Sequence, residues 1–378
     1  MRLAIVTEGF RPYIGGVETR YTELASRLAR RHEVSVFTIL RKDDGGLDPL
    51  FTEQSDGVTV HRVHQSSGYF LPDGTRSARG LVEFIVSTLR EMKSGDYDAV
   101  ICSEWPLAHI FPIAALRGSL CVVDWHEVWG RYYLGFRMKG GLGYLAERAI
   151  AKAPGLRHVA VSNFTKGRLV SILGVPSHRV AVIPSGVDSS SFDKVNAEKE
   201  PGRLIYFGRF TPHKHIEWLI EAFKRLVGSG FDLSLRIVGD GPLRWSLEEK
   251  TRGIEGVKLL GPLPKAELIR EIKSAWIAVI PSVREGQGIS YLEAMAGGTP
   301  VVAVNSQLSA AGELIDGGRN GLLVEASPRG LVEGVRSLLV NEELWSRIRD
   351  EGQRTALSFS WDESAEGFSD YLEDILSG

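Results

Sequence analysis

Two carboxylates separated by seven residues, Glu285 and Glu293, are the side chains whose type and spacing point most directly to chemistry. Glu285 is expected in the loop after a strand predicted over residues 275–282. Glu293 lies inside an otherwise uncharged helix predicted over 289–296. Burying a lone carboxylate among apolar side chains costs several kcal/mol unless a cation or a hydroxyl meets it. The hydroxyls of a bound sugar nucleotide would serve, so this pair predicts a ligand rich in hydroxyl groups.

Gly286 and Gly288 fall between these carboxylates, where the predicted helix begins. The apolar run before them is typical of a strand buried on both faces, which places the turn at the carboxyl end of a parallel sheet. Main-chain N–H groups and the positive end of the helix dipole converge there and favour an anion such as a phosphate. Two glycines alone more often make only a tight turn, but the flanking glutamates favour a ligand site.

Two cations, Arg209 and Lys214, follow another predicted strand, residues 203–207, in a turn that begins with Gly208. In a doubly wound sheet, ligands bind outside the carboxyl ends of the strands, where both cations are then placed. A guanidinium and an ammonium can hold a diphosphate through charge-assisted bonds worth roughly 1.5 to 3 kcal/mol each. Two cations in a loop are more often solvated surface, but their occurrence in one domain with the Glu285 loop favours diphosphate binding.

A second glycine turn, with Gly15 and Gly16, follows the first predicted strand and precedes the first predicted helix. It lacks the spacing of the dinucleotide-binding fingerprint, and Arg41 and Lys42 stand after the second strand where such proteins carry an acid. These departures argue against a nicotinamide-dependent oxidoreductase. The turn still offers main-chain N–H groups to a phosphate or an acceptor. His126 follows a later predicted strand. Like this turn, it is expected to face a cleft at the carboxyl ends of the strands.

Short apolar strands alternate with helices along the chain. Strands are predicted over residues 3–7, 33–39, 58–63, 99–102, 120–124, 158–162, 180–184, 203–207, 233–238, 257–260, 276–280 and 301–304. The alternation breaks near 188–202, where serine, asparagine and proline replace the periodic pattern. The pattern predicts an α/β protein with two Rossmann-like, doubly wound parallel-sheet domains, residues 1–188 and 189–360, facing a central cleft. The final helix, about 361–378, could return to the first domain.

Length and composition narrow the class of protein. The 378 residues fit two domains rather than one core, and 43% apolar with 24% charged residues is typical of a globular protein. No apolar run is long enough to span a membrane and the N-terminus begins a strand, so we expect a cytoplasmic protein. A formal net charge of −2 gives no indication of nucleic-acid binding. Cys102 and Cys121 fall in predicted core strands without metal spacing, so we expect structural roles for both.

Six motifs occur together in this chain. They are Gly15-Gly16, Ile183-Pro184-Ser185-Gly186-Val187-Asp188, Gly208-Arg209 with Lys214, Val238-Gly239-Asp240-Gly241-Pro242, the run Glu-Gly-x-Gly-Ile-x-x-Leu-Glu-Ala-Met-Ala that begins at Glu285, and Asn320-Gly321-Leu322-Leu323-Val324. In their types and order they resemble the motifs of the retaining GT-B glycosyltransferases, in the large family that includes sucrose synthases and bacterial mannosyltransferases. The resemblance covers almost the whole chain.

The resemblance implies transfer of a hexose from a nucleoside diphosphate sugar to a hydroxyl acceptor, with retention of the anomeric configuration. It implies that Glu293 binds the ribose, and that Arg209 and Lys214 hold the diphosphate and stabilise the charge of the leaving group. The expected catalytic residues are Glu285, Arg209, Lys214 and His126; the expected donor-binding residues are Gly16, Gly208, Gly286, Gln287, Gly288, Ile289 and Glu293. No Asp-x-Asp cluster or His-rich spacing accompanies them, so neither a metal nor another cofactor is expected.

Two departures from the family pattern leave the transferred sugar open. Gln287 stands where the family often has phenylalanine, in the region expected to hold the donor sugar, and Glu127 stands where an aspartate more often follows the histidine. The donor could be linked to UDP, GDP or ADP, and the acceptor could be a saccharide or a polyprenyl or other lipid. One loop combines aromatic and basic residues that would suit a saccharide, such a lipid or a membrane surface, and would equally suit simple packing: Trp125, Trp129, Arg131, Tyr132, Tyr133, Phe136, Arg137 and Lys139.

Two other classes of protein stay open at this point. A non-catalytic sugar-nucleotide-binding protein would keep Glu293, Arg209 and Lys214 but show no turnover. A nucleotide-sugar epimerase of similar two-domain shape would act without an acceptor. Turnover with an acceptor separates both from a transferase.

Overall fold

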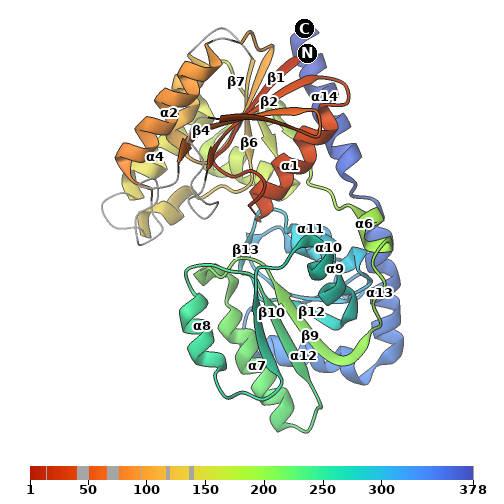
Figure 1. The fold of residues 1–378 in the computed structure, drawn as a ribbon. Helices are drawn as coiled ribbons and strands as arrows, with labels where there is room; N and C mark the ends of the chain where they lie inside the picture. The colour runs from red at the N-terminus through yellow and green to blue at the C-terminus, as the bar shows by residue number, and fades with distance from the viewer. Residues whose placement is uncertain are drawn as a thin grey trace. The chain divides into compact units, whose positions relative to one another are not determined.

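The structure is a computed structural model that describes residues 1–13, 15–40, 51–65, 76–93, 95–115, 120–135 and 140–377. The chain divides into two compact units. Unit 1 comprises Met1–Pro184 with Asp362–Gly378, and unit 2 comprises Ser185–Trp361. Each unit has its own sheet and its own hydrophobic core (Figure 1). The sequence placed the corresponding divisions after residues 188 and 360.

Unit 1 is built on one large, mostly parallel sheet. Its strands are β1 (Arg2–Val6), β2 (Glu33–Leu40), β3 (Phe51–Ser55), β4 (Val58–Gln65), β5 (Ala99–Ser103), β6 (Leu120–Trp125), β7 (Leu156–Ala160) and β8 (Val180–Val182). Within the described residues they lie in the order β3-β4-β2-β1-β5-β6-β7-β8. The expectation of a wholly parallel sheet was wrong at the edge, where β3 pairs antiparallel with β4. The sequence analysis missed β3 because its residues, Phe-Thr-Glu-Gln-Ser, contain no apolar run.

Helices cover both faces of the unit 1 sheet. They are α1 (Gly16–Leu28), α2 (Ala78–Met92), α3 (Ile110–Ala114), α4 (Gly140–Lys152), α5 (Asn163–Arg168) and α14 (Trp361–Ser377). Alternate residues of β1 enter separate apolar clusters, Ala4 with Phe84 of α2 and Leu3 with Tyr21 of α1. This two-residue alternation is what a strand buried on both faces requires. The two cysteines are buried and unbridged, in β5 and β6.

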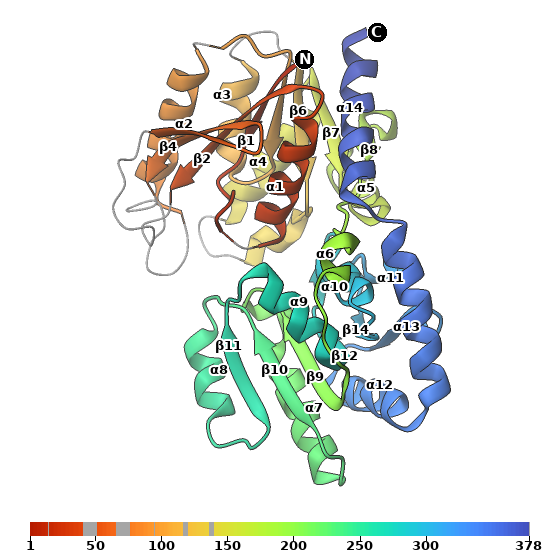
Figure 2. The ribbon, with the colours of Figure 1, turned by 45° about the vertical axis from the view of Figure 1, so that its right-hand side comes forward.

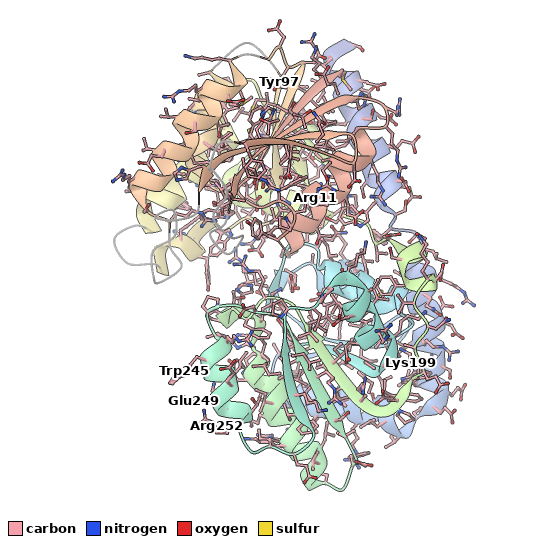
Figure 3. The ribbon with its side chains drawn as sticks, viewed as in Figure 1. Arg11, Tyr97, Lys199, Trp245, Glu249 and Arg252 are labelled. Atoms are coloured by element: carbon pink, nitrogen blue, oxygen red, sulfur yellow. The ribbon has the colours of Figure 1, made fainter. Side chains whose placement is uncertain are left out.

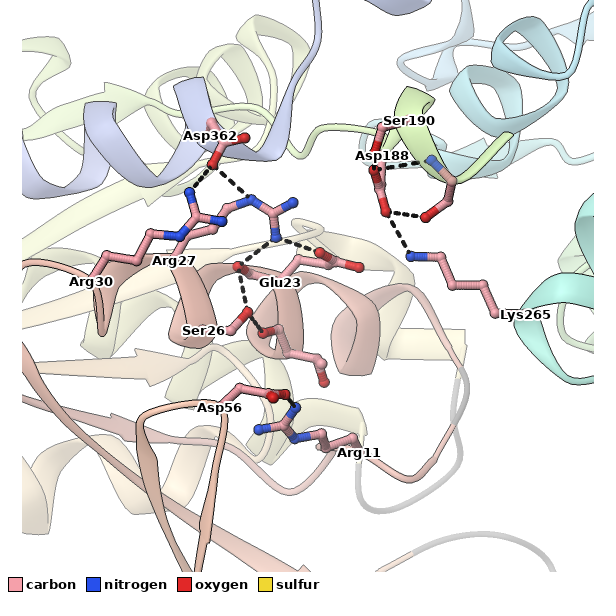
Figure 4. Close-up of polar contacts among 12 residues, drawn as sticks. Arg11, Glu23, Ser26, Arg27, Arg30, Asp56, Asp188, Ser190, Lys265 and Asp362 are labelled. Carbon is pink, nitrogen blue, oxygen red and sulfur yellow. Dashed lines mark hydrogen bonds and ion pairs between the residues drawn. The ribbon is translucent and has the colours of Figure 1, made fainter. Parts of the chain in front are cut away.

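The final helix α14 belongs to unit 1 although it comes last in the chain. Its side chains Phe368 and Leu372 are fully buried in the cluster that contains α1. Asp362, at its first turn, accepts hydrogen bonds from Arg30 over 2.7 Å and forms an ion pair with Arg27 over 3.2 Å (Figure 4). Because Asp362 is 63% exposed, these ion pairs are weak and apolar burial contributes most of the attachment. Figure 2 shows α14 running beside β7 and β8.

Unit 2 contains a six-stranded parallel sheet, and the structure describes every residue of this unit. The strands are β9 (Glu200–Phe207), β10 (Ser234–Val238), β11 (Val257–Gly261), β12 (Ala275–Ile280), β14 (Val301–Asn305) and β16 (Leu322–Glu325), in the order β11-β10-β9-β12-β14-β16. The strands β9, β10, β11, β12 and β14 lie where the apolar runs predicted them. The edge strand β16 was not predicted as a strand, because its half-buried residues form a weak pattern.

Two layers of helices sandwich the unit 2 sheet. The helices are α6 (Ser189–Asp193), α7 (Ile216–Gly228), α8 (Arg244–Thr251), α9 (Lys265–Ser274), α10 (Ile289–Ala296), α11 (Ala311–Leu314), α12 (Pro328–Val340) and α13 (Glu342–Leu357). Residues of α7, α8 and α12 share one apolar cluster, and residues of α6, α9, α10 and α11 share the other (Figure 1). The helix predicted over 289–296 is α10, with the same bounds.

A small two-stranded sheet lies beside the start of α10. It pairs β13 (Arg284–Glu285) with β15 (Leu308–Ser309) in parallel. The sequence placed Glu285 in a loop, and this was wrong because β15 supplies a pairing partner from a distant part of the chain. The carboxylate is therefore carried by a paired backbone rather than by an open loop.

Candidate active site

The two oppositely charged side chains predicted for unit 2 are in direct contact. Lys214 Nζ donates a hydrogen bond to Glu285 Oε1 over 2.5 Å, with side chains only 17% and 10% exposed. Lys214 ends the 3₁₀ turn Pro212–Lys214 after β9, and Glu285 is held by a bond from Ala310 N to its carbonyl oxygen over 2.8 Å. The partner that a buried carboxylate requires is thus a cation of the protein itself.

Positive charges from two segments gather around His213. Burial, followed by the charges of Lys214, Arg284, Arg209 and His215, lowers the pKa of His213 to about 3. His213 is therefore neutral near pH 7. Arg284, which is buried in β13, was missed by the sequence analysis. Its one sequence signal was its position directly before Glu285.

Two buried tyrosines also border Glu285 and were not predicted. Burial and then the charge of Glu285 raise the pKa values of Tyr206 and Tyr291 well above the ordinary range of a phenol. Both hydroxyls stay protonated, and that of Tyr206 donates to the carbonyl oxygen of Arg209 over 3.0 Å. Tyr206 thereby holds the turn that carries Arg209. Its position near the end of an apolar strand was the available signal, because a buried phenol usually needs a polar partner.

Gly239 allows two loops to meet at the carboxyl edge of the sheet. A Cβ on Gly239 would lie 2.0 Å from the Gly208 carbonyl oxygen, and Gly208 N donates to Val238 O over 3.0 Å. Gly208 has a φ of 144°, which glycine adopts without strain. This close approach fixes the start of the turn, and Arg209 follows it at the exposed edge.

The start of α10 has the predicted geometry of an anion site. Gly288 caps the helix with a φ of 89°, and a Cβ there would lie 2.4 Å from the Tyr291 ring. Ile289 begins the helix, so the N–H groups of its first turn lie at the positive end of the dipole. Glu293 is half-buried rather than enclosed, although its neighbours in the helix are apolar. Its carboxylate can therefore meet a ligand without full desolvation.

A buried lysine fixes the other end of α10. Lys199, labelled in Figure 3, lies in unit 2. Its Nζ donates to Ala275 O over 2.9 Å, to Thr299 Oγ1 over 2.5 Å and to Gly297 O over 3.4 Å. Ala275 and Gly297 end α9 and α10, and a cation at helix C-termini is favourable. Burial lowers the pKa of Lys199 to about 7. This contact holds the helix that carries Glu293 against the sheet.

The side chain of Gln287 takes a partner that the sequence did not indicate. Its Oε1 accepts from Ser185 N over 2.7 Å and its Nε2 donates to Ser185 O over 2.7 Å. The amide is 5% exposed. The sequence analysis placed this side chain where it would meet the donor sugar, whereas the structure binds it to main chain. Gly286 and Gln287 would then contact a donor through their backbone.

In unit 1, His126 is held by a carboxylate that the sequence analysis missed. Glu104 Oε2 accepts from His126 Nδ1 over 2.5 Å, and Glu104 Oε1 accepts from the main-chain N–H groups of His126 and Glu127 over 3.2 and 3.3 Å. Burial lowers the pKa of His126, but the nearby charges of Glu104 and Asp124 outweigh it and the pKa is raised overall. Glu104 directly follows β5, a strand-end position that is the signal for such a residue.

Replacing Glu104 by glutamine is expected to lower the pKa of His126 to or below its ordinary value. A raised folded-state pKa stabilises unit 1 below the unfolded value near 6.5, and this contribution is lost as pH rises through the folded-state pKa. The variant should therefore lose stability mainly at low pH. NMR titration of the histidines checks this. His158, whose pKa burial lowers to about 4, serves as the internal control and should not move.

Gly16 begins α1, and among the described residues no atom lies within 4 Å of the position of a Cβ there. Crowding within unit 1 therefore does not require this glycine. Ile14, in the same turn, and Arg41 and Lys42 after β2 lie outside the described residues.

The aromatic loop of unit 1 proves to be partly core. Trp125 is fully buried, and its Nε1 donates to His158 Nδ1 over 3.0 Å, which favours the packing interpretation for this residue. Trp129 meets Trp105 in a T-shaped pair, and Tyr133 packs at a tilt against both rings, which favours the packing interpretation for Trp129 and Tyr133. Arg131 and Tyr132 are exposed. Phe136, Arg137 and Lys139 lie outside the described residues.

Among the residues that the structure describes, no group of three or more His, Cys, Asp or Glu side chains is arranged to hold a metal ion. No helix in the described ranges is long and apolar enough to cross a membrane.

Comparison with known proteins assigns the class. The family description "Glycosyltransferase Family 4" matches residues 14–191, and "Glycosyl transferases group 1" matches residues 201–341. The chain therefore belongs to the group 1 glycosyltransferases, enzymes that act on nucleotide sugars. The resemblance seen in the sequence is confirmed.

Individual relatives cover nearly the whole chain. A D-inositol 3-phosphate glycosyltransferase of Geodermatophilus obscurus is 30% identical over 93% of this chain and 83% of its own length. An uncharacterised glycosyltransferase of Methanocaldococcus jannaschii is 29% identical over 97% of this chain and 96% of its own length. Among solved structures, sucrose-phosphate synthase of Thermosynechococcus elongatus has a TM-score of 0.82 and 18% identity over 100% of this chain and 99% of that chain. This likeness confirms a GT-B fold with Rossmann-like domains.

Proposed function

We propose that this glycosyltransferase moves a hexose from a nucleoside diphosphate sugar to a hydroxyl acceptor with retention of anomeric configuration. The observation that carries the proposal is the buried Lys214–Glu285 pair in unit 2, at the carboxyl edge of the sheet and among further cations. Cations there can stabilise the charge of a departing diphosphate, and a carboxylate can accept bonds from sugar hydroxyls.

Each side chain takes a distinct role in this proposal. Glu293 binds the ribose hydroxyls, Arg209 and Lys214 hold the diphosphate, and Glu285 with the backbone of residues 286–289 holds the sugar. Lys214 exchanges its bond to Glu285 for one to phosphate, which releases the carboxylate for the sugar. For unit 1, the proposal assigns Gly16 a role in binding the diphosphate and His126 a role in positioning the transferred sugar.

The bond between the sugar C1 and the phosphate oxygen breaks as the acceptor oxygen bonds to C1 from the same face. The acceptor proton passes to the departing phosphate oxygen, so no protein base is consumed. The cations then provide most of the transition-state stabilisation, because negative charge grows on the leaving group. We propose that the protein needs neither a metal nor another cofactor for this step, and activity retained in a chelator is the expected result.

The donor base and the acceptor are proposed by class. A structural neighbour of Anabaena was solved with UDP and glucose, and a starch synthase of Arabidopsis thaliana with ADP and acarbose. UDP, ADP and GDP sugars are therefore the donors to test. Exposed Tyr132, Leu142 and Leu145 in unit 1 support including lipid-linked acceptors and membrane vesicles beside saccharides.

A donor screen tests the proposal. Wild-type protein is incubated with UDP, GDP and ADP sugars in a chelator, and binding is recorded together with slow donor hydrolysis. We expect one nucleotide to bind selectively and its sugar to be released, with release lost in Glu285→Ala. Selective binding with no turnover under any acceptor would support a sugar-nucleotide-binding protein instead, and no binding to any donor would contradict the site.

Replacing Glu293 by alanine should weaken nucleotide binding by about 1 to 3 kcal/mol, because the ribose loses charge-assisted hydrogen bonds. Calorimetric titration with the nucleoside diphosphate measures this. Glu249→Ala on the exposed face of α8 is the matched control and should leave affinity unchanged (Figure 3). Equal affinities in the two variants would remove Glu293 from the site.

A further inference from the structure

The first residues of unit 2 are each fixed by a different contact. The chain passes from unit 1 to unit 2 between Pro184 and Ser185. A Cβ on Gly186 would lie 2.3 Å from Ser360 C, so this residue packs directly on the backbone of the segment that leaves unit 2. Val187 N donates to Phe359 O over 2.8 Å. The entering and leaving segments are therefore joined backbone to backbone.

Asp188 anchors the far end of the entering segment. It caps α6 by accepting from Ser191 N over 3.3 Å, and it also accepts from Ser190 Oγ over 2.7 Å and Lys265 Nζ over 3.2 Å (Figure 4). Residues 187 and 188 are thus held without help from the loop at α10. Ser185 is different, because its main-chain N–H and C=O both bind the side chain of Gln287.

Gln287 copies the hydrogen bonding of a paired strand. Its amide offers one acceptor and one donor to a single residue, and both bonds are 2.7 Å long between buried groups. Leucine or methionine could fill the space without either bond. The backbone of Gln287 lies between Glu285 and the Gly288 cap of α10, in the loop that the proposed function assigns to the donor.

We propose that Gln287 is a positioning residue that couples the donor loop, residues 285–288, to Ser185, the first residue of the entering segment. Only the expected effect of this coupling on turnover rests on the proposed function. A donor that orders the loop also orders Ser185. Because coupling is reciprocal, a change that displaces Ser185 weakens donor binding to the loop by the same coupling free energy. The conformation of Ser185 at the start of unit 2 is thereby set in part by the occupancy of the donor loop.

The first test uses the protein without ligand. Amide hydrogen exchange is compared in wild type, Gln287→Leu and Gln287→Met, the second variant guarding against misfolding of the first. Loss of two buried hydrogen bonds should speed exchange at Ser185 about tenfold or more, with faster exchange in residues 286–289 as well. Val187 should keep its protection because Phe359 still binds it.

Asn320→Leu is the matched control. Asn320 is an equally buried amide in unit 2 that accepts from Asp316 N over 2.8 Å and donates to Leu314 O over 3.0 Å. Its loss should loosen its own loop and leave Ser185 unchanged. Unchanged exchange at Ser185 in folded Gln287→Leu and Gln287→Met overturns the proposal, as does fast exchange at Ser185 with no change in residues 286–289.

The second test adds UDP, GDP and ADP in turn. In wild type, the nucleotide that binds should slow exchange in the donor loop and at Ser185 together, whereas in Gln287→Leu it should protect the loop alone. Donor hydrolysis should then fall about tenfold in kcat with KM within about threefold of wild type. Protection of Ser185 by nucleotide in both proteins overturns the coupling. Failure of wild type to bind any nucleotide overturns the proposed function instead, and the ligand-free comparison still decides the coupling.

Discussion

Replacing Lys214 by alanine should lower kcat by about 100- to 1,000-fold while nucleotide affinity changes by less than about tenfold. In the proposed function the ammonium faces a diphosphate whose negative charge grows as the sugar leaves, so its bond would be stronger in the transition state than in the bound donor. Arg209 and Arg284 remain nearby and keep the ground-state attraction for the nucleotide. Single-turnover hydrolysis of the donor together with calorimetric binding separates the two effects.

Two further variants separate the effect of the Lys214–Glu285 pair from the effect of removing any cation of unit 2. Lys265→Ala removes a cation of unit 2 whose side chain is 58% exposed and is the matched control, with turnover expected to stay at the wild-type level. Lys214→Met with Glu285→Gln removes both buried charges, and its thermal unfolding should approach that of wild type. If Lys214→Ala weakened nucleotide binding and turnover by the same factor, its role would be ground-state binding alone.

Replacing Arg20 by methionine should destabilise unit 1 by about 3 to 5 kcal/mol, since it leaves a buried carboxylate without its cation. Arg20 Nε and Nη2 donate to the two oxygens of Asp124 over 2.8 and 3.0 Å, and both side chains are 0% exposed. Arg20 also donates to Ile183 O over 3.0 Å and lies over the Phe368 ring at 5.7 Å. The Arg20 guanidinium, carried by α1, thus contacts β6, α14 and the backbone at Ile183, just before the chain leaves unit 1.

Calorimetric unfolding measures the loss, and the melting temperature of unit 1 should fall by about 10 °C or more. Arg79→Met, which removes an exposed partner of Glu83, should leave the melting temperature almost unchanged. Arg20→Met combined with Asp124→Leu should recover much of the stability because no unpaired charge remains buried. Equal losses in Arg20→Met and Arg79→Met would show that the buried pair contributes no special stability.

Most of the fold could be predicted from the sequence because its determinants are local. The apolar runs that became β1, β9 and β12 are long enough to identify as buried strands, and the helix predicted over 289–296 has the same bounds in the structure. The edge strand β3 escaped prediction because an edge strand with one exposed face needs few apolar residues. The short β13 escaped because its partner β15 lies elsewhere in the chain.

The sequence by itself determined which polar groups are placed at the carboxyl ends of strands, but the tertiary structure decided which partner each one takes. Lys214 and Glu285 are 71 residues apart, Ser185 and Gln287 are 102 apart, and Glu104 and His126 are 22 apart. Spacing and residue type predict that such groups need a partner, since an unpaired buried polar group is costly. The choice of partner depends on how distant strands align, and that alignment is fixed only when the whole core packs.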